Sequence, residues 1–185
     1  VPLMPCLFPP SPEEAEARAR RFVEMGFTAL KVKNFGDAAR DCALIRAVRR
    51  ALPKGFLQSD PNCGYTRIEE ASAALPRMAE AGLDAVEDPA GATIEEYAAL
   101  MRVLPRPRIL LDAPSRGDAA LGRLARLRPC DAVNLHPNMQ GTFSEIRDRA
   151  AALRLAGIPV EIGGTGYTGV GAFAISAVRG RTPRA

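Results

Sequence analysis

The chain has 185 residues, enough for one well-buried domain, and its 47% hydrophobic and 25% charged content is typical of a globular protein. A net charge of only +4 without a basic block, together with 5% aromatic residues, argues against a nucleic-acid partner. No apolar run approaches the roughly 18 residues of a membrane span, and four widely separated cysteines favour a reduced compartment, so we expect a cytoplasmic protein with no membrane partner.

Short strands and helices are predicted to alternate along the chain. Strands are predicted over residues 1–8, 28–33, 55–60, 83–87, 108–112, 131–136 and 158–162. Helices are predicted over residues 11–25, 37–52, 66–82, from 93 onward, 118–127 and 142–157. Capping boxes are predicted to open four of these helices, at Ser11, Thr66, Thr93 and Thr142. Glycine-rich residues 163–171 and a short helix to about Val178 complete the pattern.

This alternation predicts βα units and therefore a parallel sheet. A polar, chemically capable residue ends each of five successive strands, about 24–27 residues apart: Lys33, Asp60, Glu87, Asp112 and His136. A barrel brings all of these ends to one face, whereas a doubly wound sheet brings only some of them together. We therefore predict an α/β fold, a partial (β/α) TIM-type barrel of about seven units formed by residues 1–185. A full barrel of eight units usually needs about 250 residues, so we expect the eighth unit to be absent.

Two lysines mark the second predicted strand. Lys31 and Lys33 stand at alternate positions, so both ammonium groups lie on the same face of that strand. The chain has only three lysines among its 25 lysines and arginines. Because an ammonium can lose its proton and a guanidinium cannot, this pair indicates acid/base chemistry. Two solvated lysines on an edge strand are the alternative.

Three carboxylates, those of Asp60, Glu87 and Asp112, end three consecutive predicted strands. On one barrel rim they would repel each other strongly unless a cation lay between them. Oxygen ligands without cysteine or paired histidine favour Mg²⁺. We therefore predict a Mg²⁺ site, with Lys33 as the general base and His136 as a second acid/base. This combination suits removal of the proton next to a substrate carboxylate.

Four motifs, in this order, resemble the enolase superfamily and specifically its mandelate racemase/muconate lactonizing enzyme group. They are Lys31-Val32-Lys33, Asp60-Pro61-Asn62, Val86-Glu87-Asp88-Pro89 and Leu111-Asp112. The resemblance extends from Pro2 to about Ala174. It implies that Lys33 is the base beside Lys31, that the three acids bind Mg²⁺, and that Asn62 is a polar group near the substrate. It also implies a lyase or isomerase that acts on a small carboxylate: a sugar-acid dehydratase, a racemase or a cycloisomerase.

Several positions depart from the family's pattern. Ala113-Pro114-Ser115 follows the third acid where muconate-type members have Glu-Ser, and His136 stands where they have a second lysine. Mandelate-racemase-type members use a histidine one strand further on, where this chain has Gly163-Gly164. Members also carry an N-terminal α+β capping domain, which we do not expect before Val1.

Two other functions stay open. A truncated or non-catalytic relative would keep the barrel and turn nothing over. A barrel that binds a phosphate ligand would use residues 163–171, whose G-x-G-x-x-G pattern lacks the βαβ unit and acidic residue of a dinucleotide site. The exposed edges of an incomplete barrel also predict self-association into a homo-oligomer.

Overall fold

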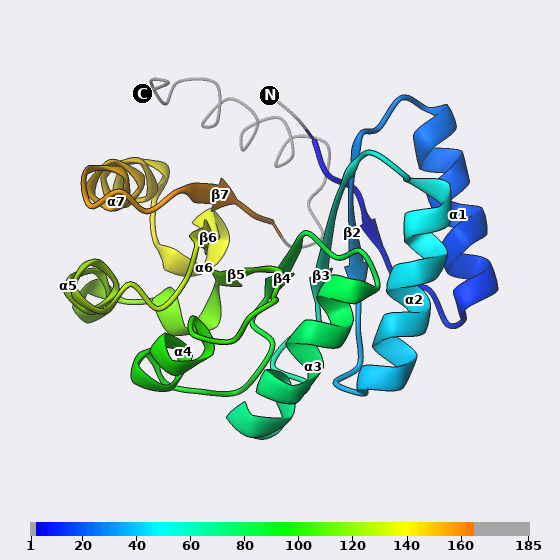
Figure 1. Cartoon of the computed structure of the whole chain (residues 1–185). Coiled ribbons are helices and arrows are strands. Elements are labelled where there is room, and N and C mark those ends of the chain that lie inside the picture. Colours follow the sequence, from blue (N-terminus) through cyan, green and yellow to red (C-terminus); the bar gives the residue numbers. More distant parts are fainter. Residues whose placement is uncertain (1–2, 165–185) are drawn as a thin grey trace.

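Seven parallel strands form one sheet in the part of the chain that the computed structural model describes, residues 3–164. They lie side by side in sequence order: β1 (Cys6–Leu7), β2 (Ala29–Lys33), β3 (Phe56–Asp60), β4 (Ala85–Glu87), β5 (Arg108–Leu111), β6 (Ala132–Leu135) and β7 (Val160–Ile162). The sheet curls, and the helices lie outside the curl (Figure 1). The predicted partial (β/α) barrel is therefore confirmed.

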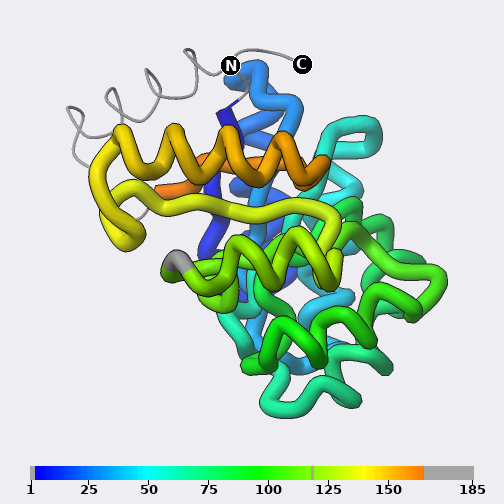
Figure 2. Tube along the Cα trace, turned by 90° about the vertical axis from the view of Figure 1, so that its left-hand side faces the viewer, coloured from blue at the N-terminus to red at the C-terminus, as the bar shows by residue number. Residues whose placement is uncertain are grey.

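The longer helices connect consecutive strands and cover the outer face of the sheet. They are α1 (Pro12–Glu24), α2 (Ala38–Ala51), α3 (Ile68–Glu80), α4 (Ile94–Leu100), α5 (Asp118–Leu127) and α7 (Phe143–Leu155). Figure 2 shows α4, α5 and α7 stacked one beside the next, and α4 contacts α5 as α5 contacts α7. No helix among residues 3–164 is long and apolar enough to cross a membrane.

Strand alternation separates the core from the interior of the barrel. In β2 the apolar residues Leu30 and Val32 are completely buried, whereas Lys31 and Lys33 on the opposite face keep some exposure. Because successive side chains point to opposite faces, the apolar set packs under the helices and the polar set points into the barrel. The strand sequence thus builds the core and the site at the same time.

Two aspartates hold the amino ends of neighbouring strands together. Asp84 and Asp131 each begin an Asp-Ala-Val segment at the start of β4 and β6. A carboxylate oxygen of Asp84 accepts the backbone N–H of Leu57 at 2.8 Å, and Asp131 accepts that of Ile109 at 2.7 Å. These bonds satisfy backbone donors where the ladder begins.

Two of the four predicted capping boxes are confirmed, and Ser11 caps α1 through the N–H of Glu14 without the reciprocal bond. Thr93 and Thr142 form reciprocal capping boxes with Glu96 and Glu145. The box predicted at Thr66 is wrong, because α3 begins one residue later, at Ile68. The hydroxyl of Thr66 therefore lies outside the cap position and donates to Glu70 at 3.0 Å instead.

Two short turns follow strand ends where no helix was predicted, η1 (Ala113–Ser115) after β5 and α6 (Pro137–Gln140) after β6. The glycine-rich loop 163–171, apart from its first two residues, and the helix predicted to about Val178 lie outside the described residues. Within residues 3–164, β1 pairs only with β2 and β7 only with β6. Self-association through such edges stays a prediction.

The capping difference can be measured. Replacing Thr93 by Ala removes a hydroxyl that accepts the Glu96 N–H at 3.3 Å, and should lower the free energy of unfolding by about 1 kcal/mol. Thr66→Ala is the matched control, since this threonine is also exposed and does not cap a helix, and it should change the free energy of unfolding little. Chemical denaturation of both variants checks this, and equal losses would contradict the assignment of the caps.

Candidate active site

The carboxylate of Glu87, at the end of β4, lies at the centre of the polar interior and is only 3% exposed. It accepts hydrogen bonds from Lys31 at 2.7 Å, from Gln58 at 2.8 Å and from Asn134 at 3.0 Å. These donors come from β2, β3 and β6. Because β2 and β6 are not neighbours of β4 in the sheet, the contacts depend on its curl. Glu87 therefore ties together both sides of the barrel.

The two lysines are paired with carboxylates. Lys31 Nζ lies between Asp60 Oδ2 at 2.8 Å and Glu87 Oε2 at 2.7 Å. Lys33 Nζ donates to Asp60 Oδ2 at 2.5 Å and to Asn62 Oδ1 at 2.7 Å. The alternative of two solvated edge lysines is therefore wrong, because both ammonium groups point into the barrel and are paired there.

These pairs decide the protonation of the cluster. Burial opposes the charged form of Lys31, but Glu87 and Asp60 outweigh it and raise the pKa of Lys31. Burial likewise opposes ionisation of Asp60, but Lys31 and Lys33 outweigh it and lower the pKa of Asp60. Lys31 is therefore a cation and Asp60 an anion at neutral pH.

Asp112 and His136 lie on the side of Glu87 that faces away from the two lysines. Arg116 donates to Asp112 Oδ2 at 2.7 Å, and His136 Nε2 lies 3.6 Å from the same oxygen. Burial lowers the pKa of His136, although Asp112 and Glu87 act in the opposite direction, so its imidazole is neutral at pH 7. Neither ring nitrogen of His136 makes a hydrogen bond within the described part of the chain.

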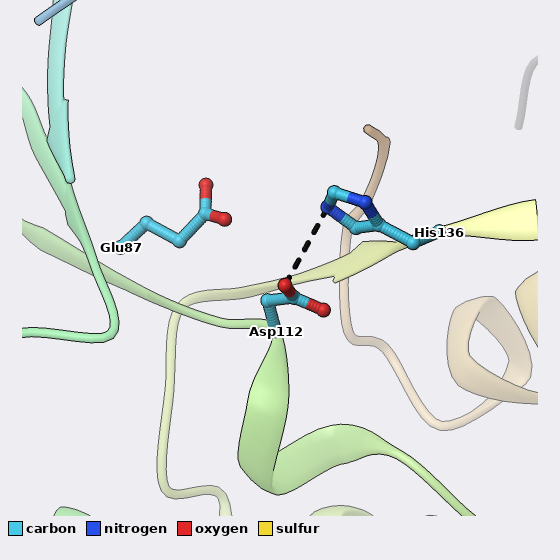
Figure 3. Close-up of side chains that lie close together, drawn as sticks. All are labelled: Glu87, Asp112 and His136. Carbon is cyan, nitrogen blue, oxygen red and sulfur yellow. Dashed lines mark ion pairs between the residues drawn. The ribbon is translucent and has the colours of Figure 1, made fainter. Parts of the chain in front are cut away.

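Figure 3 shows the side chains of Glu87, Asp112 and His136 converging on one another. One ligand atom from each lies within 4.8 Å of the others. This spread is comparable with the about 4–5 Å across the coordination shell of a hard divalent cation. Buried carboxylates and a neutral imidazole could thus hold a metal ion here. Asp60 is joined to this group through Lys31.

Asp88, the residue after Glu87 at the end of β4, is buried at 5% exposure. Its two carboxylate oxygens accept the backbone N–H groups of Asp112 at 2.9 Å and Ala113 at 2.8 Å. Burial raises the pKa of Asp88 to about 7; the two N–H groups oppose that rise, while the nearby carboxylates of Glu87 and Asp112 add to it.

Gly163, just after β7, makes room for the histidine. A Cβ atom at this position would lie 2.4 Å from His136 Nε2 and 2.5 Å from Asn134 Oδ1. Any larger residue would therefore clash with both side chains. The two departures from the family's pattern are therefore linked: the side chain of His136 occupies space that is free only because residue 163 is glycine.

The structure joins Lys31, Lys33, Asp60 and Asn62 to Glu87 through hydrogen bonds and ion pairs. It places Asp112 and His136, but not Asp60, in the group with Glu87 that could hold a metal ion. Sequence reasoning missed the functional contacts of Gln58, Asn134, Asp88 and Arg116. A signal for the first two exists, since each is a polar residue two positions before the residue at its strand's end, as Lys31 is. The departure at Ala113 falls on an exposed side chain whose backbone N–H is the group in use.

A curled parallel sheet with acids, lysines and a histidine toward its carboxyl-end rim has the architecture of a β/α-barrel, a fold whose enzymes keep their active sites on that face. The chain belongs to the enolase superfamily, in its mandelate racemase/muconate lactonizing enzyme group: the family model described as "Enolase C-terminal domain-like" matches residues 14–184.

Individual relatives agree with this family. The chain is 31% identical to an N-succinylamino acid racemase of Thermus thermophilus over 88% of this chain and 43% of the relative. It is 31% identical to an o-succinylbenzoate synthase of Geobacillus kaustophilus over 82% of this chain and 39% of the relative. A mandelate racemase/muconate lactonizing enzyme from Roseiflexus sp. superposes with a TM-score of 0.84 at 27% identity, over 96% of this chain and 51% of that one. The chain thus spans less than half the length of these two curated relatives.

The bridging role of Lys31 leads to a stability prediction. Lys31→Met leaves Glu87 as a buried anion without a cationic partner and leaves Asp60 with Lys33 alone, so the free energy of unfolding of the metal-free protein should fall by about 3–5 kcal/mol. Lys54→Met, at an exposed lysine, is the control and should change it by less than about 0.5 kcal/mol. Denaturation in the presence of a chelator measures both. Equal stability of the two variants would mean that Lys31 does not balance the acids.

Proposed function

We propose that this protein is a Mg²⁺-dependent enzyme that removes the proton α to the carboxylate of a small substrate, as a racemase or epimerase. The observation that carries the proposal is the convergence of Glu87, Asp112 and His136 opposite the paired lysines. The racemase activity in the name of the Thermus relative supports this reaction over dehydration and cycloisomerisation, which stay alternatives.

The residues present fit a divalent cation. Asp60, Glu87 and Asp112 would hold Mg²⁺, because hard cations prefer carboxylate oxygens to imidazole nitrogen. Their burial, at 1%, 3% and 8% exposure, supports this assignment, since three buried anions need positive charge nearby. In the structure that charge comes from Lys31, Lys33 and Arg116.

The bound cation would stabilise the negative charge that develops on the substrate carboxylate. Lys33 would take the α-proton, and Asn62, which accepts a hydrogen bond from it, would orient its amine. Lys31 would balance the charge of Asp60 and Glu87. His136, neutral and on the far side of the acids, would exchange a proton at the opposite face of the substrate. Two acid/base groups on opposite sides are what racemisation requires.

The role of Lys33 can be tested by isotope exchange. In the full chain with Mg²⁺, Lys33→Met should slow exchange of the α-proton of an N-succinylamino acid with solvent deuterium by at least about 10²–10⁴-fold. Lys33→Arg keeps the positive charge but cannot lose its proton, and should be equally slow. Proton NMR measures both. An arginine variant that exchanges at the wild-type rate would exclude Lys33 as the base.

A second candidate, a barrel relative without catalytic activity, is favoured by one observation. The three acids already have cationic partners within the chain, so the cluster is electrically balanced without an ion. Calorimetric titration with Mg²⁺ separates the two candidates. We expect saturable binding to one site that is abolished in Glu87→Gln, whereas an inert relative would give no binding heat.

The remaining expectations are a cytoplasmic location, a small carboxylate partner, a homo-oligomeric state and the absence of a nucleic-acid partner, and they stay predictions. The phosphate-ligand alternative depends on residues 163–171, most of which lie outside the described part of the chain.

A further inference from the structure

Backbone hydrogen bonds hold the turn that carries Asp112, in addition to the contact between its side chain and Arg116. The carbonyl oxygen of Asp112 accepts both the N–H of Ser115 at 3.1 Å and its hydroxyl at 2.7 Å. These two contacts come from the turn itself. The turn also contacts the residue that follows β4, because the N–H groups of Asp112 and Ala113 donate to the carboxylate of Asp88. Asp88 therefore joins this turn to β4.

Every polar group of Asp88 is engaged. Its N–H donates to the carbonyl of Leu110 at 3.0 Å, and its own carbonyl accepts the N–H of Cys63 at 2.8 Å. Cys63 follows Asn62, the residue that contacts Lys33. Asp88, directly after Glu87 at the end of β4, thus links the turns after β3 and β5, which carry Asn62 and Asp112.

The backbone of Asp88 is held in a strained conformation to do this. Its φ angle is +39°, in the left-handed region that residues other than glycine rarely adopt. Asn62 and Cys63, at +50° and +60°, share that conformation in the facing turn. Strain of this kind persists only when the surrounding contacts determine it, and it concentrates at functional sites.

We propose that Asp88 is a positioning residue that sets the affinity of the site for Mg²⁺ by fixing the backbone of Asp112, an inference that rests on the proposed function. Asp88 touches neither substrate nor metal in this role. It acts through the two N–H groups, which hold the carboxylate of Asp112 toward Glu87. Contacts behind metal ligands commonly change metal affinity by about 10–100-fold.

Two variants of the full chain separate the carboxylate from the backbone strain. Asp88→Gly adopts a positive φ freely and removes both acceptors, whereas Asp88→Asn tolerates that φ and keeps one acceptor. Calorimetric titration with Mg²⁺ should give a Kd raised about 10–100-fold for Asp88→Gly, with a smaller rise for Asp88→Asn.

Asp131→Asn is the matched control. Asp131 also accepts a strand N–H, that of Ile109, but at the opposite end of the sheet. This variant should be less stable than the wild type, but its Kd for Mg²⁺ should stay within about 2-fold of the wild-type value. That change is smaller than the one expected when a residue that positions a metal ligand is replaced. A purely structural role of Asp88 would instead leave the Kd of its variants equally unchanged.

Amide hydrogen exchange distinguishes failure of this inference from failure of the proposed function. In metal-free protein, the amides of Asp112 and Ala113 should exchange faster in Asp88→Gly than in the wild type. Normal Mg²⁺ binding with an unchanged Kd in both Asp88 variants overturns the positioning role and leaves the function intact. Absence of Mg²⁺ binding to the wild type overturns the proposed function and, with it, the control of affinity by Asp88. If the amides of Asp112 and Ala113 exchange at the wild-type rate in Asp88→Gly, Asp88 does not hold the turn.

Discussion

The structure depends on one buried carboxylate, Glu87, which accepts hydrogen bonds from side chains of three other strands. A carboxylate at 3% exposure is costly unless its lone pairs are satisfied and its charge is balanced. Lys31 supplies the charge, and Gln58 and Asn134 supply neutral donors. Because these partners come from β2, β3 and β6, Glu87 can be satisfied only in a sheet that curls. The hydrogen bonds of Glu87 and the curvature of the sheet therefore depend on each other.

The same coupling explains how three acids can share one rim. Each is matched by a cation of the chain: Asp60 by both lysines, Glu87 by Lys31, and Asp112 by Arg116. A divalent ion bound among the three carboxylates would compete with Lys31, Lys33 and Arg116 for them. The affinity of the site for the metal therefore depends on how rigidly each carboxylate is positioned. In our proposal, Asp88 supplies that rigidity for Asp112.

The layout of elements was predictable because it follows from local pattern. Alternation in β2 put Lys31 and Lys33 on one face, and the boxes at Thr93 and Thr142 opened helices as expected. The failure at Thr66 has a local cause too, since a shift of one residue removes a hydroxyl from capping range. Partners were less predictable: the position of Gln58 two residues before the end of its strand matches that of Lys31, but nothing local shows that its amide donates to Glu87.

By itself, the sequence determined the βα order, the strand faces and which residues stand at strand ends, because these depend on periodicities of two and of 3.6 residues. Only the tertiary structure decided that Lys31 bridges Asp60 and Glu87, that His136 occupies the space beside Gly163, and that Asp88 holds the turn after β5. Those contacts join different strands. They depend on the curvature and register of the whole sheet, which no local periodicity specifies.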